Sequence, residues 1–320
     1  MSHKTTKLLK ILLPLLLGVF LVWYALSKVS FNVILEHLKN AHYFWIILGV
    51  SLGILSHISR AYRWRFLLKP MGYNIKFANS FMAVFSGYLI NYTIPRAGEV
   101  ARASVISNYE NIQFEKTFGT IVAERMADLL VMLGIIIITL FFQFDFIYTF
   151  FSEKFNPKII IAALILLSVS GIVSIWFIKK SKSVFALKVK RFANGLVEGA
   201  LSIFKMKKKW AFIAHTLFIW LMYILMFYVT TLAFNDLKGI SLGAVLVGFI
   251  SASFSIAATN GGIGAYPLAV FAAFSLFGIA EQPSLAFGWI VWASQTLMII
   301  VIGGLSLIYL PIFNREKVKQ

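Results

Sequence analysis

Six charged residues that stand beside or inside long apolar runs are the residues of this chain best suited to bind a charged ligand. They are Arg96, Glu99, Arg102, Glu124, Arg125 and Asp128. A charge at membrane depth costs free energy, so such side chains pair with one another or line a polar pathway. The arginines suit a phosphate, and the carboxylates suit the arginines or a cationic headgroup. The alternatives are a solvated loop with helix caps for the first three residues and a structural ion-pair cluster for the last three.

Helical spacing divides these charges into two motifs. Glu99 and Arg102 are three residues apart and can share a helix face. Glu99 starts a helical stretch, where a carboxylate suits the positive N-terminal end. Glu124 and Asp128 are four residues apart, and Arg125 precedes Asp128 by three. Three charges inside one span are not expected to face lipid, so they should face the first hairpin (residues 77–95), where Arg96 or Arg102 could neutralise a carboxylate.

A glycine-rich break interrupts a second apolar segment, 241–277. Its candidate ligand-binding residues are Asn260, Gly261, Gly262, Gly264 and Tyr266. Glycine lets the backbone turn sharply and approach a ligand closely. The freed amides could receive an anion such as a lipid phosphate. Helix packing through small residues is the alternative explanation.

The composition indicates that these motifs belong to an integral membrane protein. Of 320 residues, 60% are hydrophobic and 13% charged, more apolar surface than a soluble domain of this size could hide. The net charge is +18, but the basic residues lie in short connections, as in cytoplasmic loops, so we expect no nucleic-acid partner. The chain has no cysteine, and its five histidines are scattered. It also has none of the common nucleotide, zinc or serine-hydrolase motifs, so we expect no metal, cofactor or catalytic residue. Transport would then be passive or ion-coupled.

Apolar runs long enough to cross a membrane set the expected topology. They are 8–27, 43–64, 117–142, 158–178, 210–234 and 284–310. Positive charge places both termini, the connection after the second run and the strongly basic connection 179–209 in the cytoplasm. Within 179–209, apolar residues at helical spacing predict an amphipathic helix on the inner-leaflet surface, with docking of a partner as the alternative.

Parity then requires that two shorter apolar segments return to the side from which they enter. Segment 77–95 must enter and leave from the cytoplasm, and segment 241–277 from outside, unless they are ordinary spans. Gly- or Pro-broken segments at corresponding places in two halves are typical of an inverted repeat around a transport site. The predicted fold is an all-α polytopic membrane protein with about six full spans and two broken or re-entrant hairpins arranged as an inverted repeat. It would form one integral membrane domain with halves 1–178 and 210–320 joined by the linker 179–209.

Two further expectations concern the second apolar run. His57 is expected to be a hydrogen-bonded structural residue rather than a proton relay. Arg60, Arg63, Trp64 and Arg65 are expected to form an interfacial belt.

Three motifs resemble the lysylphosphatidylglycerol synthase transmembrane-region family, also called flippase-like membrane proteins. Residues 96–102 fit the family's Arg-x-Gly-Glu-x-x-Arg pattern, and residues 124–128 fit its Glu-Arg-x-x-Asp pattern. The third pattern is Pro-Gly-Gly-x-Gly followed by Glu, and at its Pro and Glu positions this chain has Asn260 and Pro267. The resemblance implies a multi-pass inner-membrane protein that moves a lipid between leaflets and lacks the soluble aminoacyltransferase domain.

The leading hypothesis is a lipid flippase whose cargo is an anionic or aminoacylated phospholipid, a polyprenyl-linked lipid or a glycolipid. The alternative is a non-transporting scaffold or accessory subunit for a lipid-modifying glycosyltransferase or aminoacyltransferase, docked through the basic helix 184–204. A membrane transferase that uses Glu99 or Asp128 as a base is a third interpretation.

Overall fold

A computed structural model describes residues 19–94, 97–144 and 206–315, with isolated positions between them. Several predictions fall outside the described residues. They are most of the runs 8–27 and 158–178, most of the amphipathic helix of the linker 179–209, and Arg96.

The described chain is helical, and its elements contain no strand. The α-helices are α2 (Phe31–Lys39), α3 (Tyr43–Leu68), α4 (Phe77–Thr93), α5 (Gly98–Glu110), α6 (Phe114–Phe142), α10 (Lys209–Thr231), α11 (Leu242–Ala258), α12 (Ala265–Ser275) and α13 (Glu281–Phe313). Short 3₁₀ turns cover Lys69–Met71 and Asn235–Leu237. A helical stretch, Val19–Lys28, precedes α2 and is bent from it by 71°. The predicted all-α class is confirmed for these residues.

Contacts divide the chain into two compact units. One contains residues 1–122 and 210–320, and the other contains residues 123–209. The first unit therefore holds α2 to α5, the start of α6, and α10 to α13. The single membrane domain with two halves and a linker stays a prediction.

Among the described residues, four helices are long and apolar enough to cross a membrane, or five if the bent pair before α3 counts as one span. The four are α3 with its 3₁₀ extension, α6, α10 and α13. They confirm the predicted runs 43–64, 117–142, 210–234 and 284–310. A helix of 33 residues such as α13 is about 50 Å long, so it reaches beyond the hydrocarbon core at its ends.

The segment 77–95 was predicted to be a broken hairpin, but it forms one unbroken helix, α4, and the hairpin is completed by α5, which lies after these bounds. Helix α4 ends at Thr93, and Ile94 is extended. The two helices approach closely where Gly87 faces Gly98, since a Cβ on Gly87 would lie 2.8 Å from the carbonyl oxygen of Gly98. The amide of Gly98 donates to Oδ1 of Asn91 at 2.7 Å. This contact satisfies one of the free donors at the start of α5.

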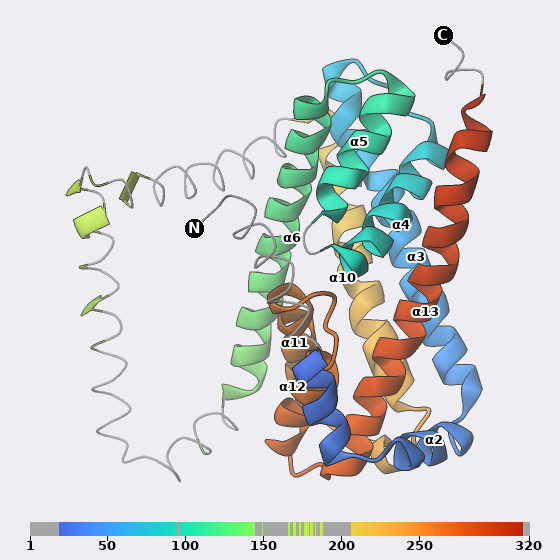
Figure 1. Cartoon of the computed structure of the whole chain (residues 1–320). Helices are drawn as coiled ribbons and strands as arrows, with labels where there is room; N and C mark the ends of the chain where they lie inside the picture. Colours follow the sequence, from blue (N-terminus) through green and yellow to red (C-terminus); the bar gives the residue numbers. More distant parts are fainter. Residues whose placement is uncertain are drawn as a thin grey trace, which may run out of the picture. The chain divides into compact units, whose positions relative to one another are not determined.

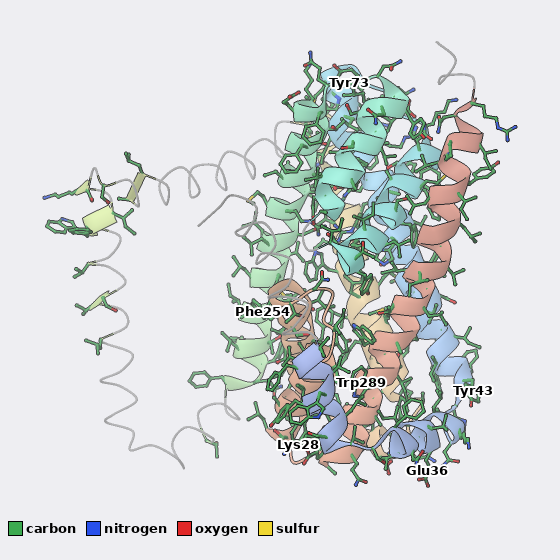
Figure 2. All side chains as sticks on the ribbon, in the orientation of Figure 1. Lys28, Glu36, Tyr43, Tyr73, Phe254 and Trp289 are labelled. Carbon is green, nitrogen blue, oxygen red and sulfur yellow. The ribbon has the colours of Figure 1, made fainter. Side chains whose placement is uncertain are left out.

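The segment 241–277 forms the second hairpin, α11–α12. The two hairpins approach α13 from opposite ends (Figure 1). At one end, Asn79 at the start of α4 pairs with Asn314 after α13. At the other, Phe274 near the end of α12 stacks on Phe287 near the start of α13, with ring centroids 5.7 Å apart. Figure 2 labels Tyr73, just before α4, at the end of the molecule opposite to Tyr43.

A polar clamp holds the open end of the first hairpin against α13. Glu110 Oε1 accepts from the backbone N–H of Lys76 at 3.0 Å and from Asn79 Nδ2 at 2.6 Å. Asn79 and Asn314 exchange two hydrogen bonds, at 3.1 and 2.8 Å, and both are buried. We call Asn79, Glu110 and Asn314 the end clamp.

Asn314→Ala should destabilise the protein, because it leaves the buried amide of Asn79 with unmet hydrogen bonds. The expected cost is about 1–3 kcal/mol, seen as a lower midpoint of thermal unfolding in detergent. Asn74→Ala is the matched control, since Asn74 is exposed. Equal midpoints for the two variants would show that the end clamp does not stabilise the fold.

Candidate functional site

The tips of the two hairpins touch each other. Asn260, in the turn between α11 and α12, donates from Nδ2 to the carbonyl oxygen of Tyr92 at 3.0 Å. Tyr92 lies in the last turn of α4, where the carbonyl groups have no partner within the helix. The side chain of Asn260 therefore joins one hairpin to the free end of the other. We call this contact and its neighbours the tip junction.

Helix α13 holds both tips. Trp292 donates from Nε1 to the carbonyl oxygen of Gly261 at 2.8 Å. Thr296 donates to the hydroxyl of Tyr92 at 3.2 Å. Trp292 and Thr296 are four residues apart and so lie on one face of α13. One face of one spanning helix thus orients the second hairpin through Trp292 and the first through Thr296.

Glycine is required in the turn of the second hairpin. Gly261, Gly262 and Gly264 all have φ between 67° and 77°, a region that L side chains disfavour. At Gly261 a Cβ would also lie 2.6 Å from Cε1 of Tyr92. The close approach of the turn to Tyr92 therefore depends on the absence of a side chain.

The same turn contains backbone donors that have no protein partner. Within the described part of the chain, the amides of Gly262, Ile263 and Gly264 make no hydrogen bond to a backbone or side-chain acceptor. Tyr266, in the first turn of α12, is buried, and its Cβ lies 3.3 Å from the position that a Cβ of Gly262 would take. Successive free amides in such a turn can receive an anion.

The residues predicted in this break differ in their structural roles. Asn260 and Gly261 form the tip junction itself. A side chain on Gly264 would collide with the backbone of Leu21 and Val22 in the first helical stretch, so this glycine serves helix packing as well as the turn. Where the family pattern has Glu, Pro267 sits in the first turn of α12, where a missing N–H is tolerated.

The described residues of the first charged motif, Glu99 and Arg102, lie on α5, and Arg102 is buried. Arg102 is 5% exposed, with its guanidinium carbon 3.8 Å from the ring centroid of Trp64 on α3. Trp64 in turn donates from Nε1 to Oγ1 of Thr120 at 2.8 Å. Arg102 is therefore not in a solvated loop. Glu99, one turn earlier, is half-buried.

Two further arginines of α3 are buried, and sequence reasoning missed them. The prediction of an interfacial belt is wrong for Arg60, Arg63 and Trp64, which are 3%, 0% and 0% exposed. Arg63 donates from Nη1 to Oγ1 of Thr216 at 2.8 Å, and Arg60 donates from Nη2 to the hydroxyl of Tyr223 at 3.5 Å. Their i, i+3 and i+4 spacing places these three side chains on one face of α3. That spacing was the feature of the sequence from which their shared burial could have been predicted.

We call the three buried arginines Arg60 and Arg63 of α3 and Arg102 of α5 the arginine cluster. Arg102 stacks on Trp64, and Trp64 is adjacent to Arg63 and one turn from Arg60. Guanidinium groups bind phosphate oxygens in pairs with a planar geometry. Buried arginines on α3 and α5 are therefore candidate groups for binding a phosphate.

The second charged motif lies in the second unit. Arg125 Nη1 is 3.9 Å from Oδ2 of Asp128, as the i, i+3 spacing indicates, and Glu124 is buried. That these charges face the first hairpin stays a prediction.

Comparison with known proteins identifies the family. A sequence model of the lysylphosphatidylglycerol synthase TM region matches residues 11–303. The chain belongs to this family. All three motifs of this lysylphosphatidylglycerol synthase TM-region protein lie inside the matched range, as do both hairpins.

A curated relative is similar to part of this family member. The UPF0104 membrane protein MJ1595 of Methanocaldococcus jannaschii is 29% identical over 170 residues, which are 52% of this chain and 49% of that protein. The chain thus spans about half the length of the relative that it matches. No solved structure matches the chain significantly.

Proposed function

We propose that this protein moves a lipid with an anionic headgroup between the leaflets of the cytoplasmic membrane. The observation that carries the proposal is the tip junction. Two broken hairpins approach α13 from opposite ends and meet at the bond between Asn260 and Tyr92. Broken helices that meet inside a helical bundle are the usual site of transported substrates, because their free backbone groups must line a polar space.

The arginine cluster supplies the headgroup site at one end. Its three guanidinium groups are buried, and cations at membrane depth are retained where they serve an ion or substrate pathway. A lipid phosphate that slides in from the adjacent leaflet would be held by Arg102 and Arg63, while its acyl chains stay in the bilayer. The proposed roles of Glu99, Glu124 and Asp128 are to hold the arginines or to meet a cationic group on the lipid.

The tip junction would separate this site from the other leaflet. For the headgroup to cross, the contact between Asn260 and Tyr92 must open. Beyond it, the free amides of Gly262, Ile263 and Gly264 would offer a second set of anion donors. The spans α3–α6 and α10–α13, each with one hairpin between its ends, would act as an inverted repeat that opens to one face at a time.

Reconstitution of the pure protein tests the proposal. Liposomes would carry fluorescent phosphatidylglycerol, phosphatidylcholine or a polyprenyl phosphate in turn, and leaflet exchange would be followed by quenching of the outer-leaflet label. We expect faster exchange of one anionic class than in protein-free vesicles and loss of that rate in Asp128→Ala. No exchange of any class by demonstrably folded protein would contradict a flippase and favour a membrane scaffold, which should be inert alone.

A further inference from the structure

His57 is a buried histidine with an unsatisfied nitrogen. It lies midway along α3 and is 6% exposed. Its Nδ1 is buried and makes no hydrogen bond within the described part of the chain. The expectation that His57 is satisfied by hydrogen bonding is therefore wrong for this atom. Buried polar atoms in native proteins almost always have partners, so an exception calls for an explanation, and an ionisable group at membrane depth is a functional candidate.

Aromatic rings surround the imidazole. Its centroid lies 5.3 Å from the ring of Phe85, 4.8 Å from that of Tyr88 and 6.0 Å from that of Tyr223. These rings come from α4 and α10, so His57 sits where three helices meet. The charged and titratable groups that face it are Arg60 on α3, Tyr88 on α4 and Tyr223 on α10. Aromatic faces attract a cation, and an imidazolium can use this attraction where a neutral imidazole cannot.

His215, on the neighbouring face of α10, has a different environment. Its Nδ1 lies 2.8 Å from Oγ of Ser59, so this nitrogen already has its partner. The two histidines thus occupy the same region of the first unit with opposite hydrogen-bonding states. His57 has a free position for a proton, and His215 is its matched control.

We propose that His57 binds a proton together with the anionic headgroup held by the arginine cluster. This inference rests on the proposed function. A proton taken from water would form an N–H bond at the free lone pair of Nδ1. Arg60 lies three residues along α3, close enough for its positive charge to oppose a second one. An anion held within the arginine cluster reduces that opposition, so each ligand strengthens binding of the other by the same factor.

The proton on His57 would act as a coupling ion for transport. If headgroup and proton occupy the first unit together and leave together, a proton gradient can bias the direction in which the lipid moves. Tyr223 connects the two sites, because it accepts a hydrogen bond from Arg60 and lies against the ring of His57.

Calorimetric titration of the full chain in detergent with dioctanoyl phosphatidylglycerol tests the inference. Titrations in two buffers of different ionisation enthalpy measure protons taken up on binding. As the pH is lowered over the range in which the protein stays folded, we expect net proton uptake on binding and an affinity that rises by up to about tenfold per pH unit. His57→Gln should abolish both effects, and His215→Gln should keep them.

The outcomes separate this inference from the proposed function. Phosphatidylglycerol binding without proton uptake by the wild-type protein would overturn the inference and leave an anionic-lipid site in place; this readout needs no variant to fold. Equal proton uptake in His57→Gln would also overturn it. Failure of folded wild-type protein to bind phosphatidylglycerol at any pH, with dioctanoyl phosphatidylcholine as the comparison, would contradict the anionic-headgroup site itself.

Discussion

Arg102→Gln should lower the rate of anionic-lipid exchange by about 100-fold. A paired interaction of guanidinium with phosphate consists of two charge-assisted hydrogen bonds, together worth roughly 3 kcal/mol or more, and each 1.4 kcal/mol is about a factor of ten. Glutamine keeps the stem of the side chain against Trp64 but has no charge. The measurement is the quenching assay in proteoliposomes, with the variant and wild type at equal protein content.

Two companion variants make this result specific. Arg102→Lys keeps the charge and loses the planar pair of donors, so its rate should lie between those of wild type and Arg102→Gln. Arg65→Gln removes an arginine that is partly exposed and stacks on Tyr62, with 5.3 Å from guanidinium carbon to ring centroid; it should keep the wild-type rate. The same loss in Arg65→Gln, or a full rate in Arg102→Gln, would remove Arg102 from the headgroup site.

Gly261→Ala should stop transport at the tip junction. The added methyl would lie 2.6 Å from the ring of Tyr92, and the turn must also hold alanine at a φ of 67°. Either the two tips move apart or Tyr92 leaves Thr296. In both cases the contact that we propose to open and close is lost, and exchange of the anionic lipid should fall to the protein-free rate.

The variant Gly278→Ala separates the effect of backbone strain from the effect of the collision with Tyr92. Gly278 also has a positive φ, 71°, but a Cβ there would meet no atom within 4 Å. Both variants should lose about 1 kcal/mol of stability from the strained backbone, which lowers the thermal midpoint of each. Gly261→Ala should lose more, because it also carries the cost of the collision with Tyr92. Only Gly261→Ala should lose exchange. Loss of exchange in both would point to general destabilisation and not to the tip junction.

Much of the fold was predictable because membrane topology follows from two simple quantities. Apolar length identified the spans that became α3, α6, α10 and α13, and the charges of the connections then required each hairpin to return to its own side. In the helix pair α4–α5 the end clamp joins the two outer ends beside Asn314. Helix α4 itself is unbroken, and the side to which each hairpin returns stays a prediction. The predicted helix start at Glu99 was also close, since α5 begins at Gly98.

The site itself was less predictable, because it depends on contacts between distant segments. Asn260 and Tyr92 are 168 residues apart, and no local pattern relates them. The burial of Arg60 and Arg63 depends on which face of α3 packs against α10, and a basic cluster at the end of an apolar run also fits an exposed belt. For Asn260, the replacement of the family Pro indicated a difference but not that its amide would bond to another hairpin.

Helix α13 contacts both hairpins, at three levels along its length. Asn314, after its last turn, holds the start of α4; Trp292 and Thr296 hold the two tips; Gly288 packs against Pro267 of α12. A tilt of this one helix therefore displaces both hairpins in the same event. Opening toward one leaflet and closing toward the other would then be a single concerted transition with one barrier, and a state open to both sides, through which ions would leak, would not be populated.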